Sequence, residues 1–158
     1  MKNLKKSFPP KSDAEIQKIC RHFYHHLCDL IVESIKLFSI KSDQIQKRFK
    51  VNNPEILQPY FDQGKSIILV GGHYNNWEML AAGIDQQVAH ETVALYSQLS
   101  NPFFDSKMKS SRGAFGLRMV TTKESFAYFK EECTTPRMTI FGADQSPTYS
   151  KSVQWTTF

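Results

Sequence analysis

The chain has 158 residues, which is enough for one domain with a hydrophobic core. Hydrophobic residues make up 41% of it and aromatic residues 13%, a composition that excludes an intrinsically disordered chain. The formal net charge of +5 is modest, and no basic stripe with interleaved aromatic residues occurs, so we expect no nucleic-acid partner. No apolar run approaches the roughly 20 residues of a membrane-spanning helix, and no signal peptide is visible.

Two features of the composition bear on the compartment. The three cysteines, an odd number without framework spacing, indicate reduced thiols in a reducing compartment. Positive charge is concentrated near the start, at Lys2, Lys5, Lys6 and Lys11. Such a run is either a solvated tail or a basic segment that faces anionic lipid, and the sequence leaves both interpretations open.

The first part of the chain is predicted to be helical. Ser12 and Glu15 have the spacing of a capping box, and apolar residues then recur at steps of three and four as far as Phe38. This pattern predicts a long amphipathic helix over residues 13–39. A second helix is expected over 42–49, and a third between Pro54 and Gly64. Together these segments form a helical lead-in over residues 12–64.

From residue 65 onward, predicted strands alternate with predicted helices. The strands are expected over 66–70, 91–96, 117–121 and 137–141, and the first, an apolar run before Gly71-Gly72, should be buried on both faces. The helices are expected over 76–85, from Pro102 to a stop at Gly116, and over 123–131. This alternation predicts an α/β core with a mainly parallel sheet over residues 65–158.

The loops that follow the predicted strands carry the polar residues. In open α/β sheets, ligands bind off the carboxyl ends of the strands. The loops in question cover residues 71–76, 97–98, 122–123 and 142–146, and three of them contain groups suited to chemistry. We therefore expect these loops to converge on a site.

His73 and Glu78 are the candidate catalytic pair. On a single helix their spacing would turn them about 140° apart, so they can meet only if His73 lies in the loop and Glu78 in the first helical turn. A carboxylate on one imidazole nitrogen fixes the tautomer and leaves the other nitrogen to act as a general base. The alternative is that Glu78 only complements the helix dipole and that His73 is an ordinary loop histidine.

The segment Gly72-His73-Tyr74-Asn75-Asn76-Trp77-Glu78 resembles the His-x4-Asp/Glu motif of glycerolipid acyltransferases. Its His-x-x-Asn-Trp-Glu form resembles that of the lipid A biosynthesis late acyltransferase family, of the lauroyl or myristoyl type. Three further segments resemble blocks of this family in the same order: Tyr96 to Asp105, Ser111 to Gly116, and Ala143 to Pro147. The resemblance covers most of the chain.

The resemblance implies a glycerolipid-acyltransferase-like sandwich and an O-acyltransferase without cofactor or metal. The enzyme would move a fatty acyl chain from acyl carrier protein or coenzyme A to a hydroxyl of a lipid precursor, at the cytoplasmic face of the inner membrane. It implies His73 as general base and Glu78 as its partner. The substrate-binding residues that it implies are Asn76, Tyr96, Arg112, Lys123, Asp144 and Gln145.

Several of these assignments have alternatives. Arg112 is expected to bind a phosphate, but it could also be an arginine that only reaches out from the core edge. Asp144 and Gln145 are expected to shape the pocket, or else to form an ordinary turn. His22 and His26 have the spacing of a metal pair, although exposed helix histidines are the favoured interpretation and no metal site is predicted.

Three further expectations concern the chain as a whole. Members of the family usually begin with an apolar anchoring helix and continue past the segment that ends this chain. We therefore expect the 158-residue chain to be incomplete at both ends, prone to aggregate and of low turnover by itself. The alternatives to lipid A synthesis are acylation of another membrane lipid and a non-catalytic lipid-binding module of the same fold.

Overall fold

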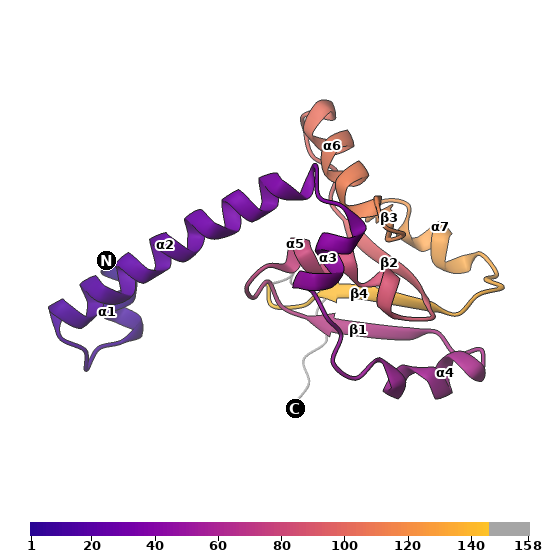
Figure 1. The fold of residues 1–158 in the computed structure, drawn as a ribbon, viewed down its shortest axis with the longest axis horizontal. Helices are drawn as coiled ribbons and strands as arrows, with labels where there is room; N and C mark the ends of the chain where they lie inside the picture. The colour runs from indigo at the N-terminus through magenta and orange to yellow at the C-terminus, as the bar shows by residue number, and fades with distance from the viewer. Residues whose placement is uncertain (146–158) are drawn as a thin grey trace. The chain divides into compact units, whose positions relative to one another are not determined.

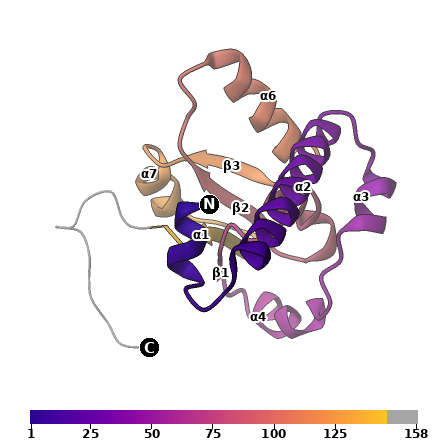
Figure 2. The ribbon, with the colours of Figure 1, turned by 90° about the vertical axis from the view of Figure 1, so that its left-hand side faces the viewer.

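The computed structural model describes residues 1–145, which form two compact units, Met1–Ile40 and a second unit from Lys41 onward. The first unit contains α1 (Lys2–Ser7) and α2 (Asp13–Leu37). The chain folds back between the two helices, so that α1 lies beside the start of α2 (Figure 2), where Lys5 Nζ is 2.6 Å from Asp13 Oδ1. The basic start of the chain is therefore helical, which sequence analysis did not predict.

Helix α2 confirms the predicted long amphipathic helix. It begins at the predicted capping box, in which the Ser12 hydroxyl accepts from the Glu15 amide and the Glu15 carboxylate accepts from the Ser12 amide. Because side chains three and four residues apart share a helix face, its apolar residues form one stripe. Members of this stripe are exposed: Phe23, Tyr24, Leu27, Ile31, Ile35 and Phe38. Within residues 1–145 no helix is both long and apolar enough to cross a bilayer.

The second unit is built on a parallel sheet (Figure 1). Three short helical segments precede the sheet: α3 (Ser42–Arg48), the 3-10 helix η1 (Pro54–Leu57) and α4 (Gln58–Asp62). The strands are β1 (Ile67–Gly71), β2 (Glu91–Tyr96), β3 (Arg118–Thr121) and β4 (Arg137–Gly142). All pairings are parallel and the spatial order is β1-β4-β2-β3. The predicted α/β class and the mainly parallel sheet are confirmed.

The helices between the strands lie on opposite faces of this sheet. Helices α5 (Trp77–Gly83) and α6 (Pro102–Gly113) cover the face that carries Leu69, Ala94 and Ile140. On the other face, α7 (Ser125–Lys130) buries Tyr128 against Val93 and Val120. Because successive strand residues point to alternate faces, these two sets identify the layers.

Strand β1 differs from the prediction that it is buried on both faces. Ile68 and Val70 are 68% and 65% exposed, whereas Ile67 and Leu69, which point to the face covered by α5, are half-buried. The prediction is wrong because β1 is an edge strand that pairs only with β4. Helix α7 packs against β3 at the opposite edge, and within residues 1–145 no helix covers Ile68 and Val70.

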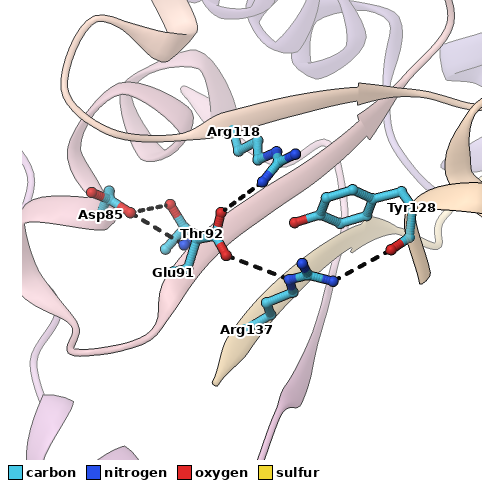
Figure 3. A network of polar contacts seen from close by, with 6 residues as sticks. All are labelled: Asp85, Glu91, Thr92, Arg118, Tyr128 and Arg137. Carbon is cyan, nitrogen blue, oxygen red and sulfur yellow. Dashed lines mark hydrogen bonds and ion pairs between the residues drawn. The ribbon is translucent and has the colours of Figure 1, made fainter. Parts of the chain in front are cut away.

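A polar network fixes α7 at the amino-terminal ends of the strands (Figure 3). The guanidinium groups of Arg118 and Arg137 lie over the Tyr128 ring, 4.5 and 4.2 Å from its centre. Arg118 donates to Oε1 of Glu91 at 3.3 Å, and Arg137 donates to Oε2 of the same carboxylate at 3.4 Å. Burial raises the pKa of the Tyr128 hydroxyl. The charges of this network are paired with one another, and they stabilise the packing of α7. The network lies at the amino-terminal ends of the strands, away from their carboxyl ends, where a binding site is expected.

Candidate active site

The loops after β1 and β4 lie side by side because these strands are parallel neighbours. Gly71 and Gly142 are register partners at the carboxyl ends of the two strands. Beyond them, the Ala143 amide donates to the Gly71 carbonyl at 2.8 Å. The predicted convergence is confirmed for these two loops, which carry His73 and Asp144.

The start of α5 places His73 in the loop and Glu78 in the first helical turn, as predicted. Asn75 adopts a positive φ of 56°, a conformation that asparagine tolerates better than most residues. Asn76 then caps the helix, its side-chain oxygen accepting from the Met79 amide at 2.9 Å. The cap fixes Trp77 as the first helical residue and sets the direction in which Glu78 leaves the helix.

The His73 imidazole is held by Asp144. Its Nδ1 lies 2.7 Å from Asp144 Oδ1, and the His73 backbone amide donates to Asp144 Oδ2 at 2.8 Å. The hydrogen bond from the imidazole holds the pKa of the Asp144 carboxyl below its ordinary value, so this oxygen is an ionised acceptor. Nδ1 then carries the hydrogen, and Nε2 is left with a lone pair that can take a proton.

Two neighbours restrict the imidazole further. The Trp77 ring meets it edge to face, with ring centres 5.2 Å apart. Gly142 lies directly against it, since a Cβ atom at that position would be 2.8 Å from His73 Cε1. A larger residue at the end of β4 would therefore force the His73 ring or the strand to shift.

Glu78 is not the partner of His73, which corrects the expected pairing. The Glu78 carboxylate accepts two hydrogen bonds from Arg112, from Nε at 2.8 Å and from Nη2 at 2.5 Å. The two side chains are only 12% and 25% exposed, and the hydrogen bonds to Glu78 raise the pKa of Arg112. A guanidinium that reaches both carboxylate oxygens binds them more strongly than a neutral imidazole can, which is the physical reason for the difference.

A mostly apolar cavity of about 240 Å³ begins at His73. It lies on the sheet face that α5 and α6 cover, and Arg112 is the cationic residue in its wall. The other lining side chains are mainly hydrophobic and include Trp77, Leu69, Leu80, Ala94, Leu95, Tyr96, Met119, Ile140 and Phe141. A histidine whose Nδ1 contacts a carboxylate, a cation and an apolar cavity are thus brought together at the carboxyl ends of the strands.

Comparison with known families identifies the protein class. The profile of bacterial lipid A biosynthesis acyltransferases matches residues 1–158, which is the whole chain. The chain belongs to this family. The predicted family is thereby confirmed, and with it an acyltransferase of lipid A biosynthesis. Comparison with curated proteins gave no match.

Of the residues predicted to bind substrate, some line the cavity and others do not. Tyr96 and Arg112 line the cavity, whereas Asn76 serves as the cap of α5. Lys123 and Gln145 are exposed and are not among the described residues that line the cavity. Lys123 follows β3, which β4 and β2 separate from β1, so the sheet order keeps it away from His73. Ser146 and Pro147 lie outside the described residues.

Sequence reasoning named Asp144 but missed its contact with His73. It also missed Trp77 and Gly142 as neighbours of the imidazole. The available signal was that Asp144 follows a predicted strand, as His73 does, so both belong to the same sheet edge. What the sequence did not show is that β1 and β4 are neighbours.

Proposed function

We propose that this acyltransferase moves a fatty acyl chain from a thioester of acyl carrier protein or coenzyme A to a hydroxyl group of a lipid A precursor. The observation that carries the proposal is the position of His73. Its Nδ1 is hydrogen-bonded to Asp144, and its ring lines an apolar cavity. A fatty acyl chain suits the cavity, and a hydroxyl nucleophile needs a base.

In the proposed reaction, His73 Nε2 removes the proton from the acceptor hydroxyl as its oxygen attacks the thioester carbonyl carbon. The new carbon–oxygen bond gives a tetrahedral intermediate, from which the carbon–sulfur bond breaks. The thiolate leaves and takes the proton from the imidazolium, so the base returns to its starting state. Asp144 acts as a positioning residue, because it holds the ring and stabilises the imidazolium during the cycle.

Arg112 is proposed to bind a phosphate oxygen of the donor or the acceptor. It lines the cavity, and its hydrogen bonds to Glu78 use only Nε and Nη2. A guanidinium has five N–H donors, so others remain for a ligand. Glu78 keeps the group in place, which lowers the entropy cost of binding an anion there.

The function is tested by incubating the protein with dodecanoyl-acyl carrier protein or dodecanoyl-coenzyme A and a phosphorylated lipid A precursor. We expect thiol release coupled to a lipid whose mass increases by one acyl group, because the cavity suits the chain and His73 activates a hydroxyl. The new acyl group should be removed by mild alkali, as an ester is and an amide is not. Alkali-resistant product would contradict hydroxyl transfer, and thiol release without acylated lipid would contradict transfer altogether.

We also propose that the protein works at the cytoplasmic face of the inner membrane. The support is the exposed apolar stripe of α2, which lies in the same unit as the basic helix α1. Apolar side chains on one face of a helix with nearby lysines suit the surface of an anionic bilayer. This combination favours the lipid-facing interpretation of the basic start over a solvated tail.

Replacing Ile31 and Ile35 together with aspartate should lower binding to phosphatidylglycerol vesicles by about tenfold or more. Burying each isoleucine contributes ~1.5–3 kcal/mol, and an aspartate is repelled by the anionic surface. The measurement is vesicle co-sedimentation at low and high salt. The matched control adds the same charge at His22 and His25, which are exposed on the polar side of α2. Equal losses in both double variants would contradict a membrane-facing apolar stripe.

A further inference from the structure

The start of α6 carries an exposed apolar surface. Phe103 and Phe104 are 64% and 56% exposed, and their rings meet edge to face with centres 5.6 Å apart. Leu99, in the loop that leads to the helix, is exposed as well. We call these three residues the aromatic tip. Large apolar side chains that are gathered at one place, rather than scattered singly, indicate a surface that binds a partner.

The aromatic tip is held by local hydrogen bonds. The Asn101 side-chain oxygen accepts from the amides of Phe103 and Phe104, at 3.0 and 3.3 Å, and so begins the helix at this point. The Asp105 carboxylate accepts from the Leu99 amide at 2.8 Å, which ties the loop to the first helical turn. A fixed backbone thus holds the apolar side chains in solvent, which lowers the entropy cost of binding a partner there.

The aromatic tip lies at the outer end of α6. Residues 101–104 are all exposed, whereas Arg112, near the other end of the helix, is half-buried in its ion pair with Glu78. Figure 2 shows α6 standing beyond the strands of the sheet. The tip follows β2 and His73 follows β1, so both belong to the carboxyl ends of parallel strands. The tip therefore projects from the part of the molecule that contains the active site.

The charges around the aromatic tip favour an anionic partner. Asp105 is the only acidic residue of α6, and it is buried. Lys107 and Lys109 are exposed, and Lys107 Nζ lies 5.9 Å from the centre of the Phe103 ring. Hydrocarbon beside positive charge is the combination that binds to the surface of an anionic bilayer.

We propose that the aromatic tip inserts into the surface of an anionic bilayer and so brings the active site to its lipid acceptor. The inference rests on the proposed function, because it takes the acceptor to be a lipid of that bilayer. Apolar side chains of interfacial helices enter the bilayer by about 5–10 Å. With a rise of ~1.5 Å per residue, Arg112 lies ~14 Å along the axis from Phe103. If α6 enters along its axis, Arg112 comes to lie in the headgroup layer, where the phosphate groups are.

A negatively charged protein is the alternative partner. Most protein interfaces combine apolar contacts with about one hydrogen bond per 100–200 Å². At the aromatic tip, however, the amides of Leu99, Phe103 and Phe104 already donate to Asp105 and Asn101. The tip therefore offers hydrocarbon with its backbone donors already used, which suits acyl chains better than a protein surface.

The contact is tested with a tryptophan placed in the aromatic tip. The sequence has two tryptophans, Trp77 and Trp155, and both are first replaced with phenylalanine. Phe103→Trp is added to this background, and Ile56→Trp is the matched control. Ile56 is 62% exposed, but it precedes β1 and thus lies toward the opposite end of the sheet.

Phosphatidylglycerol vesicles should shift the emission of the Phe103→Trp protein to shorter wavelength. Vesicles with brominated acyl chains should quench it about twofold or more, because the introduced ring lies among the acyl chains. The emission of the Ile56→Trp protein should change little in either case. The expected result is therefore a difference between two reporters of similar exposure at opposite ends of one unit.

Removing the phenylalanine side chains should weaken the contact. Phe103→Ser combined with Phe104→Ser is expected to lower binding to these vesicles by about tenfold or more, because two apolar side chains lose their burial. The KM for an acceptor lipid carried in vesicles should rise similarly, whereas the KM for a short-chain, water-soluble acceptor should not. Ile56→Ser combined with Tyr60→Ser, which changes two exposed apolar residues near the start of β1, should alter neither value.

The outcomes separate this contact from the others that are proposed. Co-sedimentation with vesicles without any shift in the Phe103→Trp protein would mean that α2 alone binds the bilayer, and the inference would be wrong. A shift caused by acyl carrier protein in the absence of vesicles would assign the tip to a protein partner and would also overturn it. If no acceptor is acylated while the reporter shifts and is quenched, the proposed reaction is wrong and the bilayer contact stands.

Discussion

Replacing His73 with alanine is expected to lower kcat by ~100- to ~10,000-fold, the usual contribution of a general base. The KM values for donor and acceptor should change little, because the imidazole acts on the proton that is transferred in the transition state and makes few contacts with the bound substrates before the reaction. Thermal unfolding should also change little, since the side chain is 38% exposed. Initial rates of thiol release measure the effect, and a variant within tenfold of the wild type would exclude His73 as the base.

Two glycines supply a matched control for the position of the imidazole. A Cβ at Gly142 would lie 2.8 Å from His73 Cε1, whereas a Cβ at Gly71, its register partner, would meet no atom within 4 Å. Gly142→Ala should therefore lower the rate by up to ~100-fold with the histidine still present, because it displaces the ring. Gly71→Ala should leave the rate near that of the wild type. Equal rates in the two variants would mean that the ring position is unimportant.

The parts of the fold that follow from local rules were predicted well. Strand β2 has the predicted bounds, α2 begins at the predicted capping box of Ser12, and α6 begins at Pro102 as expected. These features depend on a few neighbouring residues, on turn chemistry and on hydrophobic period, all of which can be read in one sequence. The family could be recognised for a related reason, since its motifs are short and keep their order.

The predictions that were wrong concern features that depend on which segments, far apart in the sequence, become neighbours in the fold. The exposure of Ile68 and Val70 follows from the position of β1 at the sheet edge, and strand order is not written in local pattern. Likewise, the spacing of His73 and Glu78 permits a contact but does not require one. The outcome is decided by Arg112, which is 34 residues from Glu78, and by Asp144, which is 71 residues from His73.

The two carboxylates therefore have separate tasks, and substitution should distinguish them. Asp144→Asn is expected to lower kcat by about 100-fold or more, because an amide can present its N–H to Nδ1 and favour the wrong tautomer, as in hydrolase triads. The donor and acceptor KM values should be nearly unchanged. Glu78→Gln instead weakens the hold on Arg112, so it should raise the KM for the phosphorylated substrate and lower stability by about 2 kcal/mol. Steady-state kinetics and thermal unfolding of the two variants make the comparison.

A double-mutant cycle then shows which carboxylate acts through the imidazole. In the His73→Ala background, Asp144→Asn should cause almost no further loss of kcat, because the group that Asp144 positions is already absent. Glu78→Gln in the same background should keep its full effect on the substrate KM, because Arg112 is still present. The reverse result, in which Glu78→Gln loses its effect and Asp144→Asn keeps its own, would restore Glu78 as the partner of His73. Coupling energies of this kind are expected between groups in contact, so the cycle tests the contact seen between His73 and Asp144.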